Sequence, residues 1–172
     1  MNLEFSIAQQ EDLGKIVQTY NAAIPAQMAT ADLEPVSILS KQTWFEAHSA
    51  NKRPLWLVQH SGNYAGWLSF NSFYGRPAYD GTAEISIYLE NAYQGKGIGK
   101  ACLAKAIAEA PSLDVHTLLG FIFSHNHASL NLFYAFGFDT WAKLPRVANM
   151  QGVMRDLHIV GLKTKHPLNV NT

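Results

Sequence analysis

Apolar and polar residues alternate in several short segments of the chain, which is the spacing of a half-buried β-strand. Leu3, Phe5 and Ile7 form the first such segment. Residues 83–89 give the clearest alternation, with three aliphatic side chains on one face and polar or aromatic side chains on the other. Further strands are expected at residues 55–59, 64–70 and 115–123, and two more around residues 149–152.

Four other segments place apolar residues three and four positions apart, which predicts helices. Residues 11–21 carry Leu13, Ile16, Val17 and Tyr20 at this spacing. The others are expected from residue 35 onward with Leu39, Trp44 and Phe45 on the apolar side, after the glycines of residues 95–99 as far as Pro111, and over residues 128–136. Prolines bound residues 24–35, which predicts a loop or broken helix there.

The order of these elements indicates a mixed α/β fold of the α+β type. No internal repeat and no low-complexity linker divides the 172 residues, and this length suits one domain with its own hydrophobic core. We therefore expect a single domain over residues 1–164, followed by a C-terminal tail over residues 165–172.

Composition excludes several classes of protein. Thirteen basic and thirteen acidic residues give a net charge of zero, which argues against a protein that binds nucleic acid through its phosphates. Cys102 is the only cysteine, so neither an internal disulfide nor a cysteine zinc cluster can form. The chain begins without the pattern of a signal peptide and has no apolar stretch of membrane-spanning length, so we expect a cytoplasmic protein with no membrane partner.

A glycine cluster between a strand and a helix carries the strongest chemical signal. Gln94, Gly97 and Gly99 stand at the spacing Q-x-x-G-x-G, with Lys96 and Lys100 among them. Glycines let the backbone approach a ligand closely, and the first N–H groups of a helix can point at an anion. The cluster therefore predicts a binding site for a pyrophosphate.

Two better-known phosphate-binding motifs do not fit this cluster. A Walker A loop needs a glycine where Gln94 stands and a serine or threonine where Ala101 stands. A dinucleotide fingerprint needs a glycine where Lys100 stands, close to the first strand of its domain. For this segment alone, a glycine-rich turn without a ligand remains the alternative.

A second motif lies downstream and identifies a family. The later motif is Asn126-x-x-Ser129-x-x-Leu132, which ends in Phe136-Gly-Phe138. With the Q-x-x-G-x-G cluster before it, the chain resembles the GNAT N-acetyltransferases over nearly its whole length. This resemblance implies the GNAT fold, a mixed, mostly antiparallel twisted sheet of six to seven strands flanked by about four helices. It also implies acetyl-CoA as the cosubstrate, and direct transfer to an amine while both substrates are bound.

A narrower resemblance concerns the phosphinothricin and methionine sulfone acetyltransferase branch of that family. Residues 79–89, which read Y-D-G-T-A-E-I-S-I-Y-L, are similar to the branch pattern, as are Arg76 just upstream and the early Tyr20-Asn21. The resemblance implies a small-molecule amine as acceptor, in particular an amino acid or analogue, and a homodimer.

The resemblance assigns roles to individual residues of this sequence. Glu84 is implied as the catalytic base, with a structural carboxylate as the alternative. Arg76 and Tyr79 are implied to hold a substrate carboxylate, because arginine pairs bidentately with carboxylates, with an exposed loop arginine as the alternative. The residues implied to bind acetyl-CoA are Ile87, Tyr88, Leu89, Gln94, Gly95, Lys96, Gly97, Ile98, Gly99, Lys100, Asn126, Ser129 and Phe133.

One position departs from the family pattern. Many GNAT enzymes have a tyrosine seven residues after the motif asparagine, and the narrower branch has a histidine, whereas this chain has Phe133. Phenylalanine cannot donate a proton, and Tyr134 is about 100° further around the helix. The sequence therefore assigns no general acid to the departing CoA thiolate.

Three functions follow as hypotheses: an acetyltransferase for small amines, a protein or peptide N-acetyltransferase, and a non-catalytic acyl-CoA-binding module. No metal is expected. His125 and His127 flank Asn126, but no third ligand is evident. Cys102 and the four tryptophans are expected to serve packing.

Overall fold

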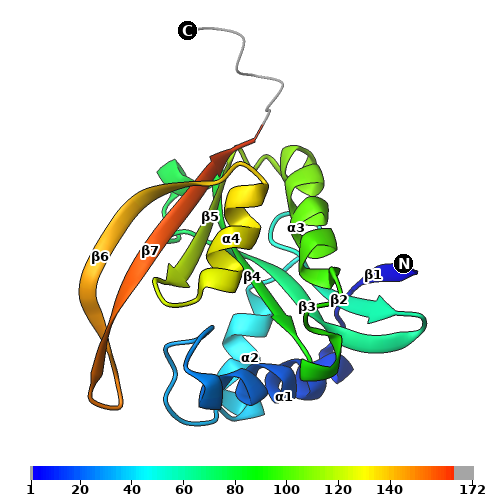
Figure 1. Ribbon diagram of the computed structural model, residues 1–172. Helices are drawn as coiled ribbons and strands as arrows, with labels where there is room; N and C mark the ends of the chain where they lie inside the picture. The colour runs from blue at the N-terminus through cyan, green and yellow to red at the C-terminus, as the bar shows by residue number, and fades with distance from the viewer. Residues whose placement is uncertain (1, 165–172) are drawn as a thin grey trace, which may run out of the picture.

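Seven strands form one sheet in residues 2–164, the part of the chain that the computed structural model describes (Figure 1). The sheet order is β1-β2-β3-β4-β5-β7-β6, and every neighbouring pair is antiparallel except β4 and β5. The strands are β1 (Leu3–Ile7), β2 (Leu55–His60), β3 (Asn63–Ser72), β4 (Thr82–Leu89), β5 (Thr117–Phe123), β6 (Asp139–Met150) and β7 (Val153–Lys163). The predicted mixed, mostly antiparallel sheet of six to seven strands is confirmed.

Four α-helices accompany the sheet in the described residues, as predicted. They are α1 (Leu13–Ala23), α2 (Ile38–Glu46), α3 (Ile98–Glu109) and α4 (His127–Ala135). Ser37 begins α2 by accepting a hydrogen bond from the backbone N–H of Ser40, which satisfies one unpaired donor of the first turn. Pro111 follows α3 inside a short 3₁₀ turn, Ala110–Leu113. The predicted tail, residues 165–172, lies outside the described residues.

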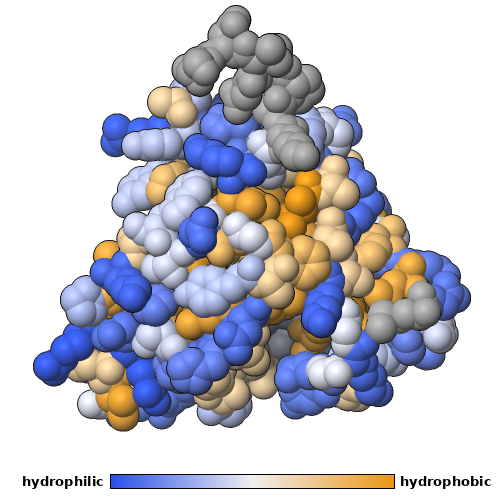
Figure 2. All heavy atoms as spheres, turned by 45° about the horizontal axis from the view of Figure 1, so that its top comes forward, coloured by the Kyte–Doolittle hydropathy of each residue, from blue (hydrophilic) through white to orange (hydrophobic). Residues whose placement is uncertain are grey.

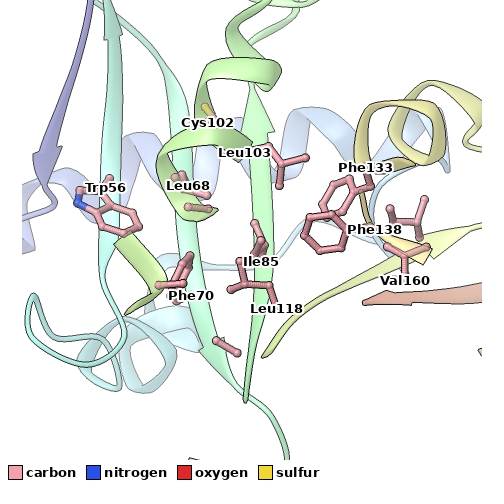
Figure 3. Close-up of a cluster of buried hydrophobic side chains, with 14 of the residues drawn as sticks. Trp56, Leu68, Phe70, Ile85, Cys102, Leu103, Leu118, Phe133, Phe138 and Val160 are labelled. Carbon is pink, nitrogen blue, oxygen red and sulfur yellow. The ribbon is translucent and has the colours of Figure 1, made fainter. Parts of the chain in front are cut away.

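Opposite faces of the sheet carry different helices. The larger buried cluster joins the sheet to α3 and α4, and Figure 3 shows Leu68, Phe70 and Ile85 of β3 and β4 facing the helical residues Cys102 and Leu103. The smaller cluster joins Trp67 and neighbouring strand residues to α1 and α2. Successive side chains along a strand point to opposite faces of the sheet, so the same strands contribute residues to both buried clusters.

The prediction that Leu39 lies on the apolar side of α2 was wrong. Trp44 and Phe45 pack against the smaller cluster, whereas Leu39 is 85% exposed. At about 100° per residue, Leu39 lies about 140° around the helix from Trp44, so both cannot face the sheet. In this helix the two aromatic side chains, with more area to bury, set the orientation.

β4 and β5 separate from one another partway along their length. Their parallel pairing covers Thr82–Glu84 and the three residues from Thr117 to Leu119, and beyond Glu84 the strands diverge (Figure 1). β4 stays paired with β3 as far as Leu89. The second half of β4 therefore has one edge without a partner strand in the described residues.

The surface is mixed rather than uniformly polar. On the face seen in Figure 2, hydrophilic side chains surround a band of apolar ones. Ten large hydrophobic residues of the described chain are exposed, several of them on the β6–β7 hairpin. None of the helices formed by residues 2–164 has the length and apolar character needed to cross a membrane.

Candidate functional site

The unpaired edge of β4 presents backbone N–H groups. The N–H of Glu90 donates to the carbonyl of Ala65 at 2.9 Å, which fixes the side of β4 that faces β3. Because backbone groups alternate along a strand, the N–H and C=O groups of Ile87 and Leu89 point the other way, toward the diverging β5. The Leu89 carbonyl accepts a hydrogen bond from Nε2 of Gln94 at 3.1 Å. These two N–H groups remain available to a ligand.

The glycine cluster follows directly and turns sharply into α3. Gly95 and Gly97 have φ angles of 71° and 81°, in the left-handed region that glycine adopts without steric cost, and Gly97 is the N-cap of α3. The first N–H groups of α3 are therefore presented at an exposed turn beside the exposed Lys96 and Lys100. Ile98 is different, because its side chain is buried in the core and only its backbone can face a ligand.

The second motif has a structural task in this chain. Oδ1 of Asn126 accepts the N–H of Ser129 at 3.1 Å and so caps α4, while its Nδ2 donates to the carbonyl of Met28 at 3.0 Å. Phe133 is buried, with its ring 4.8 Å from that of Phe138, in the core on the inner side of α4 (Figure 3). These contacts occupy the polar groups of Asn126 and enclose the ring of Phe133.

A loop segment bridges the two diverging strands. The carbonyls of residues 27, 28 and 29 accept hydrogen bonds from Nε2 of His125 at 2.9 Å, Nδ2 of Asn126 at 3.0 Å and the hydroxyl of Tyr88 at 2.7 Å. Tyr88 belongs to β4, and the other two follow β5. The sequence predicted a loop here, but nothing in the local pattern indicated that it ties these strands together.

A cavity of about 300 Å³ opens on the α1–α2 face of the sheet. It is lined by Ile16, Val17, Tyr20, Lys41, Trp44, Trp67, Asn71, Glu84, Ser86 and Tyr88. Aromatic rings form much of its wall: the rings of Trp67 and Tyr88 stack 4.6 Å apart, and those of Trp44 and Tyr20 adjoin them at 5.6 Å and 5.0 Å. The cavity thus combines aromatic walls with polar side chains, an arrangement that suits a small-molecule site.

Glu84 lies where the cavity meets the unpaired edge. It is the last residue of β4 that pairs with β5, and its half-buried side chain lines the cavity. Burial raises the pKa of the Glu84 carboxyl, because the ionised form loses hydration. Within the described residues no donor or cation bonds to this carboxylate, so it is available to a ligand.

The other two residues predicted to bind substrate lie elsewhere. Arg76 and Tyr79 belong to the exposed loop before β4, where the Tyr79 ring packs 5.4 Å from that of Phe73, and neither lines the cavity. The cation that does line it is Lys41, whose Nζ lies 4.5 Å from the ring centre of Tyr20. Sequence reasoning missed Lys41, because nothing in α2 indicates which strand it faces.

Residues 2–164 bring together no group of three or more histidine, cysteine, aspartate or glutamate side chains that could hold a metal ion. Cys102 is buried in the core, and burial raises the pKa of its thiol to about 12.

Comparisons with known proteins match this chain to acetyltransferases. A model of the acetyltransferase (GNAT) family matches residues 17–138. YwnH of Bacillus subtilis (strain 168), whose name refers to phosphinothricin acetyltransferase, is 45% identical over 156 residues, which cover 90% of this chain and 95% of YwnH. An L-methionine sulfoximine/L-methionine sulfone acetyltransferase of Salmonella typhimurium is 30% identical over 156 residues, 91% of each chain. The solved structure of yncA from Salmonella typhimurium with its cofactor acetyl-CoA superimposes with a TM-score of 0.88 at 27% identity, covering 100% of this chain and 99% of that one.

Proposed function

Because this chain belongs to the acetyltransferase (GNAT) family, whose members use acetyl-CoA, we propose that it acetylates the amine of a free amino acid or analogue held in the cavity beside Glu84. One observation carries the proposal. Glu84 lines the cavity and is also the last residue of β4 that pairs with β5. A single carboxylate therefore adjoins both the proposed acceptor site and the proposed acetyl-CoA site.

The described backbone fits acetyl-CoA. The N–H groups of Ile87 and Leu89 suit the amide-rich arm of the molecule, and the turn at Gly95 and Gly97 suits its pyrophosphate. Bound acetyl-CoA supplies a thioester whose carbonyl carbon accepts the amine nitrogen while the CoA thiolate departs. We propose that a free N–H of β4 also donates to the thioester oxygen as negative charge develops there.

The task of Glu84 follows from the acidity of amines. A peptide α-amine has a pKa of about 8, so at neutral pH most of the acceptor is protonated and cannot attack. We propose that the Glu84 carboxylate takes this proton, directly or through a water molecule. Its raised pKa makes it a stronger base than an exposed glutamate.

We propose that the departing thiolate is protonated by water. Phe133 has no proton to give, and the Tyr134 hydroxyl is paired with Oγ1 of Thr140 at 2.7 Å on the exposed side of α4. Tyr88 donates its proton to the Ala29 carbonyl, and Tyr20 to Asp32. Because a thiol has a pKa of about 8.5, the thiolate is a tolerable leaving group without an assigned acid.

The size of the cavity favours a small acceptor. A volume of about 300 Å³ is at the lower limit of ordinary ligand pockets, and aromatic walls suit a short side chain of an amino acid. The related Salmonella enzyme is named for methionine sulfoximine and methionine sulfone, which are such molecules.

A thiol-release assay tests this function. Purified protein and acetyl-CoA are mixed with free amino acids, including L-methionine sulfone and phosphinothricin, or with peptides. Release of CoA with the free amino acids supports the proposal. Release with peptides alone would make the chain a peptide N-acetyltransferase, and binding of acetyl-CoA without release in any mixture would make it a non-catalytic binding module.

We further propose that the enzyme is a cytoplasmic homodimer. Trp141, Val147, Val153 and Met154 expose apolar surface on the β6–β7 hairpin, and a second copy could bury it. A lone, buried cysteine also suits a reducing compartment. Sedimentation equilibrium of the purified protein should give twice the chain mass, and a monomer at micromolar concentration would contradict the dimer.

A further inference from the structure

Lys41 is a half-buried cation without an anionic partner. The ion pairs of the described residues are Lys15–Asp12, Lys52–Asp80 and Lys105–Glu109. Lys41 takes part in none of them and donates no hydrogen bond to another described residue. Its Nζ instead lies over the Tyr20 ring at 4.5 Å and near the Trp44 ring at 5.9 Å. Partial burial of an unpaired ammonium is unfavourable, so this arrangement suggests an anion supplied by a ligand.

Neither Asp32 nor Glu84 forms an ion pair with Lys41. Asp32 accepts a hydrogen bond from the Tyr20 hydroxyl at 2.5 Å but lies beyond ion-pair distance of Lys41. Glu84 lines the same cavity from β4, while Lys41 lines it from α2. The cavity lining therefore includes a carboxylate from the sheet, an ammonium from α2 and several aromatic rings.

We propose that Lys41 binds the carboxylate of the acceptor and so selects free amino acids over amines that lack a carboxylate. This inference rests on the proposed function and names the specificity-determining residue for it. An amino acid has its amine and carboxylate on one carbon. With the amine toward Glu84 and the carboxylate toward Lys41, its side chain meets the aromatic wall formed by Trp44 and Trp67.

This assignment differs from the one that the family resemblance implies. Arg76 is exposed in the loop before β4 and does not line the cavity, whereas Lys41 does. The Lys41 ammonium is also held over the Tyr20 ring, so Lys41 has less conformational freedom to lose on binding than a surface lysine.

The test compares two substrates that differ in one charge. The kcat/KM values for L-methionine sulfone and for its methyl ester are measured with the wild-type enzyme and with Lys41→Met, Lys41→Arg and Arg76→Gln. A charge-assisted hydrogen bond of ordinary strength predicts that Lys41→Met lowers kcat/KM for the acid about 30-fold, mainly through KM. The value for the ester should change less than about threefold. Lys41→Arg should retain most of the activity with the acid.

Comparing variants within each substrate cancels the different amine acidities of acid and ester. An equal loss for acid and ester in Lys41→Met would overturn the inference, because Lys41 would then act only in packing or in general electrostatics. A selective loss in Arg76→Gln but not in Lys41→Met would overturn it in favour of the loop arginine. Thermal unfolding of each variant checks that the fold is retained.

Calorimetric titration separates this inference from the proposed function. If the wild-type protein releases no CoA but binds L-methionine sulfone, and Lys41→Met binds it at least tenfold more weakly, the carboxylate site stands and the proposed reaction fails. Equal binding by both proteins, or no binding by either, overturns the carboxylate site whatever the thiol-release assay gives.

Discussion

At the scale of single residues, we predict that Glu84 combines its proposed role as a base with a cost in stability. Its carboxyl lines the cavity, and burial raises its pKa because the ionised form is poorly hydrated. Groups whose pKa is shifted in this way gather at functional sites. Glu84 makes no hydrogen bond within the described residues that would explain it as a structural carboxylate.

Replacing Glu84 by glutamine should lower kcat about 100-fold, the range for loss of a general base. The dissociation constant of acetyl-CoA should stay nearly unchanged, because the variant alters no backbone N–H group of β4. The wild-type kcat/KM should also fall as the pH drops through the raised pKa of Glu84, and this acid limb should be absent in the variant. Steady-state kinetics from pH 5 to 9 provide the check, and near-normal turnover would remove Glu84 from the reaction.

The same substitution, which should lower activity, should raise the stability of the folded protein. Because the pKa of Glu84 is higher in the folded state than its ordinary value of 4.5, the folded state favours the protonated form. Its contribution to stability is therefore greatest below the ordinary pKa and is lost as the pH rises through the folded-state pKa.

Glu84→Gln should then have a higher melting temperature than the wild type at pH 8, and the difference should close near pH 4. Melting curves at the two pH values test this, with the exposed Glu4→Gln as the matched control that should change neither. A wild type more stable than Glu84→Gln at pH 8 would mean that the carboxylate stabilises the fold.

Sequence reasoning reached only part of the site at this scale. Glu84 and the glycine cluster could be predicted because they belong to one contiguous stretch, residues 84–99, in which motif and strand pattern coincide. Lys41, Trp44 and Asn71 could not, because they reach the cavity from α2 and β3 through tertiary packing. Asn126 was predicted to bind acetyl-CoA, and its observed role in capping α4 depends on the loop that it holds.

At the scale of elements, the turn between β4 and α3 depends on backbone conformations that favour glycine. Gly97 has a φ of 81° and begins α3. Alanine there should cost about 1 kcal/mol of stability and should weaken acetyl-CoA binding about tenfold by moving the first N–H groups of the helix.

Gly62 is a matched control, because it has a φ of 77° in the β2–β3 turn and lies outside the predicted acetyl-CoA motif. Gly62→Ala should lower stability to a similar extent and leave the dissociation constant of acetyl-CoA unchanged. Calorimetric titration of acetyl-CoA into both variants measures these dissociation constants. Unchanged binding in Gly97→Ala would show that this turn does not hold the cofactor.

The packing of α4 on β5 offers a second test at this scale. A Cβ atom on Gly120 would lie 2.7 Å from the ring of Phe133 and 3.1 Å from a methyl group of Val160. Gly120→Ala should therefore lower the free energy of unfolding by about 2 kcal/mol, as overpacking does.

Adding Phe133→Leu should recover part of this loss, because the smaller side chain makes room. Phe133→Leu alone should lower stability and leave the KM for acetyl-CoA unchanged, since the ring is in the core. Urea unfolding and steady-state kinetics of the single and double variants measure both effects. A raised KM for acetyl-CoA without a change in stability would instead indicate that Phe133 contacts acetyl-CoA.

The pattern of strands and helices was predictable because it is local, and the order of elements agrees with the sequence. The buried side of α2 was not predictable, because Leu39, Trp44 and Phe45 cannot all face the sheet. Only tertiary packing determines which of them are buried. The divergence of β4 from β5 depends on pairing between residues more than 30 positions apart, such as Glu84 and Leu119, and leaves no local signal.

At the scale of the whole molecule, the fold brings the two proposed binding regions to one strand. α1 and α2 build the cavity on one face of the sheet, while α3 begins beside the unpaired edge of β4 and packs on the other face. Glu84 stands between the two regions. An acceptor and acetyl-CoA could thus be bound together without competing for the same surface, as direct transfer requires.

Transfer of a labelled acetyl group tests the proposed reaction and the role of Glu84 together. The protein is incubated with ¹⁴C-acetyl-CoA and L-methionine sulfone, and the N-acetylated product and free CoA are both quantified for the wild type and Glu84→Gln. Direct transfer with Glu84 as the base predicts one labelled product per CoA released, formed about 100-fold more slowly by the variant. CoA release without acetylated amine, or equal rates for the two proteins, would contradict it.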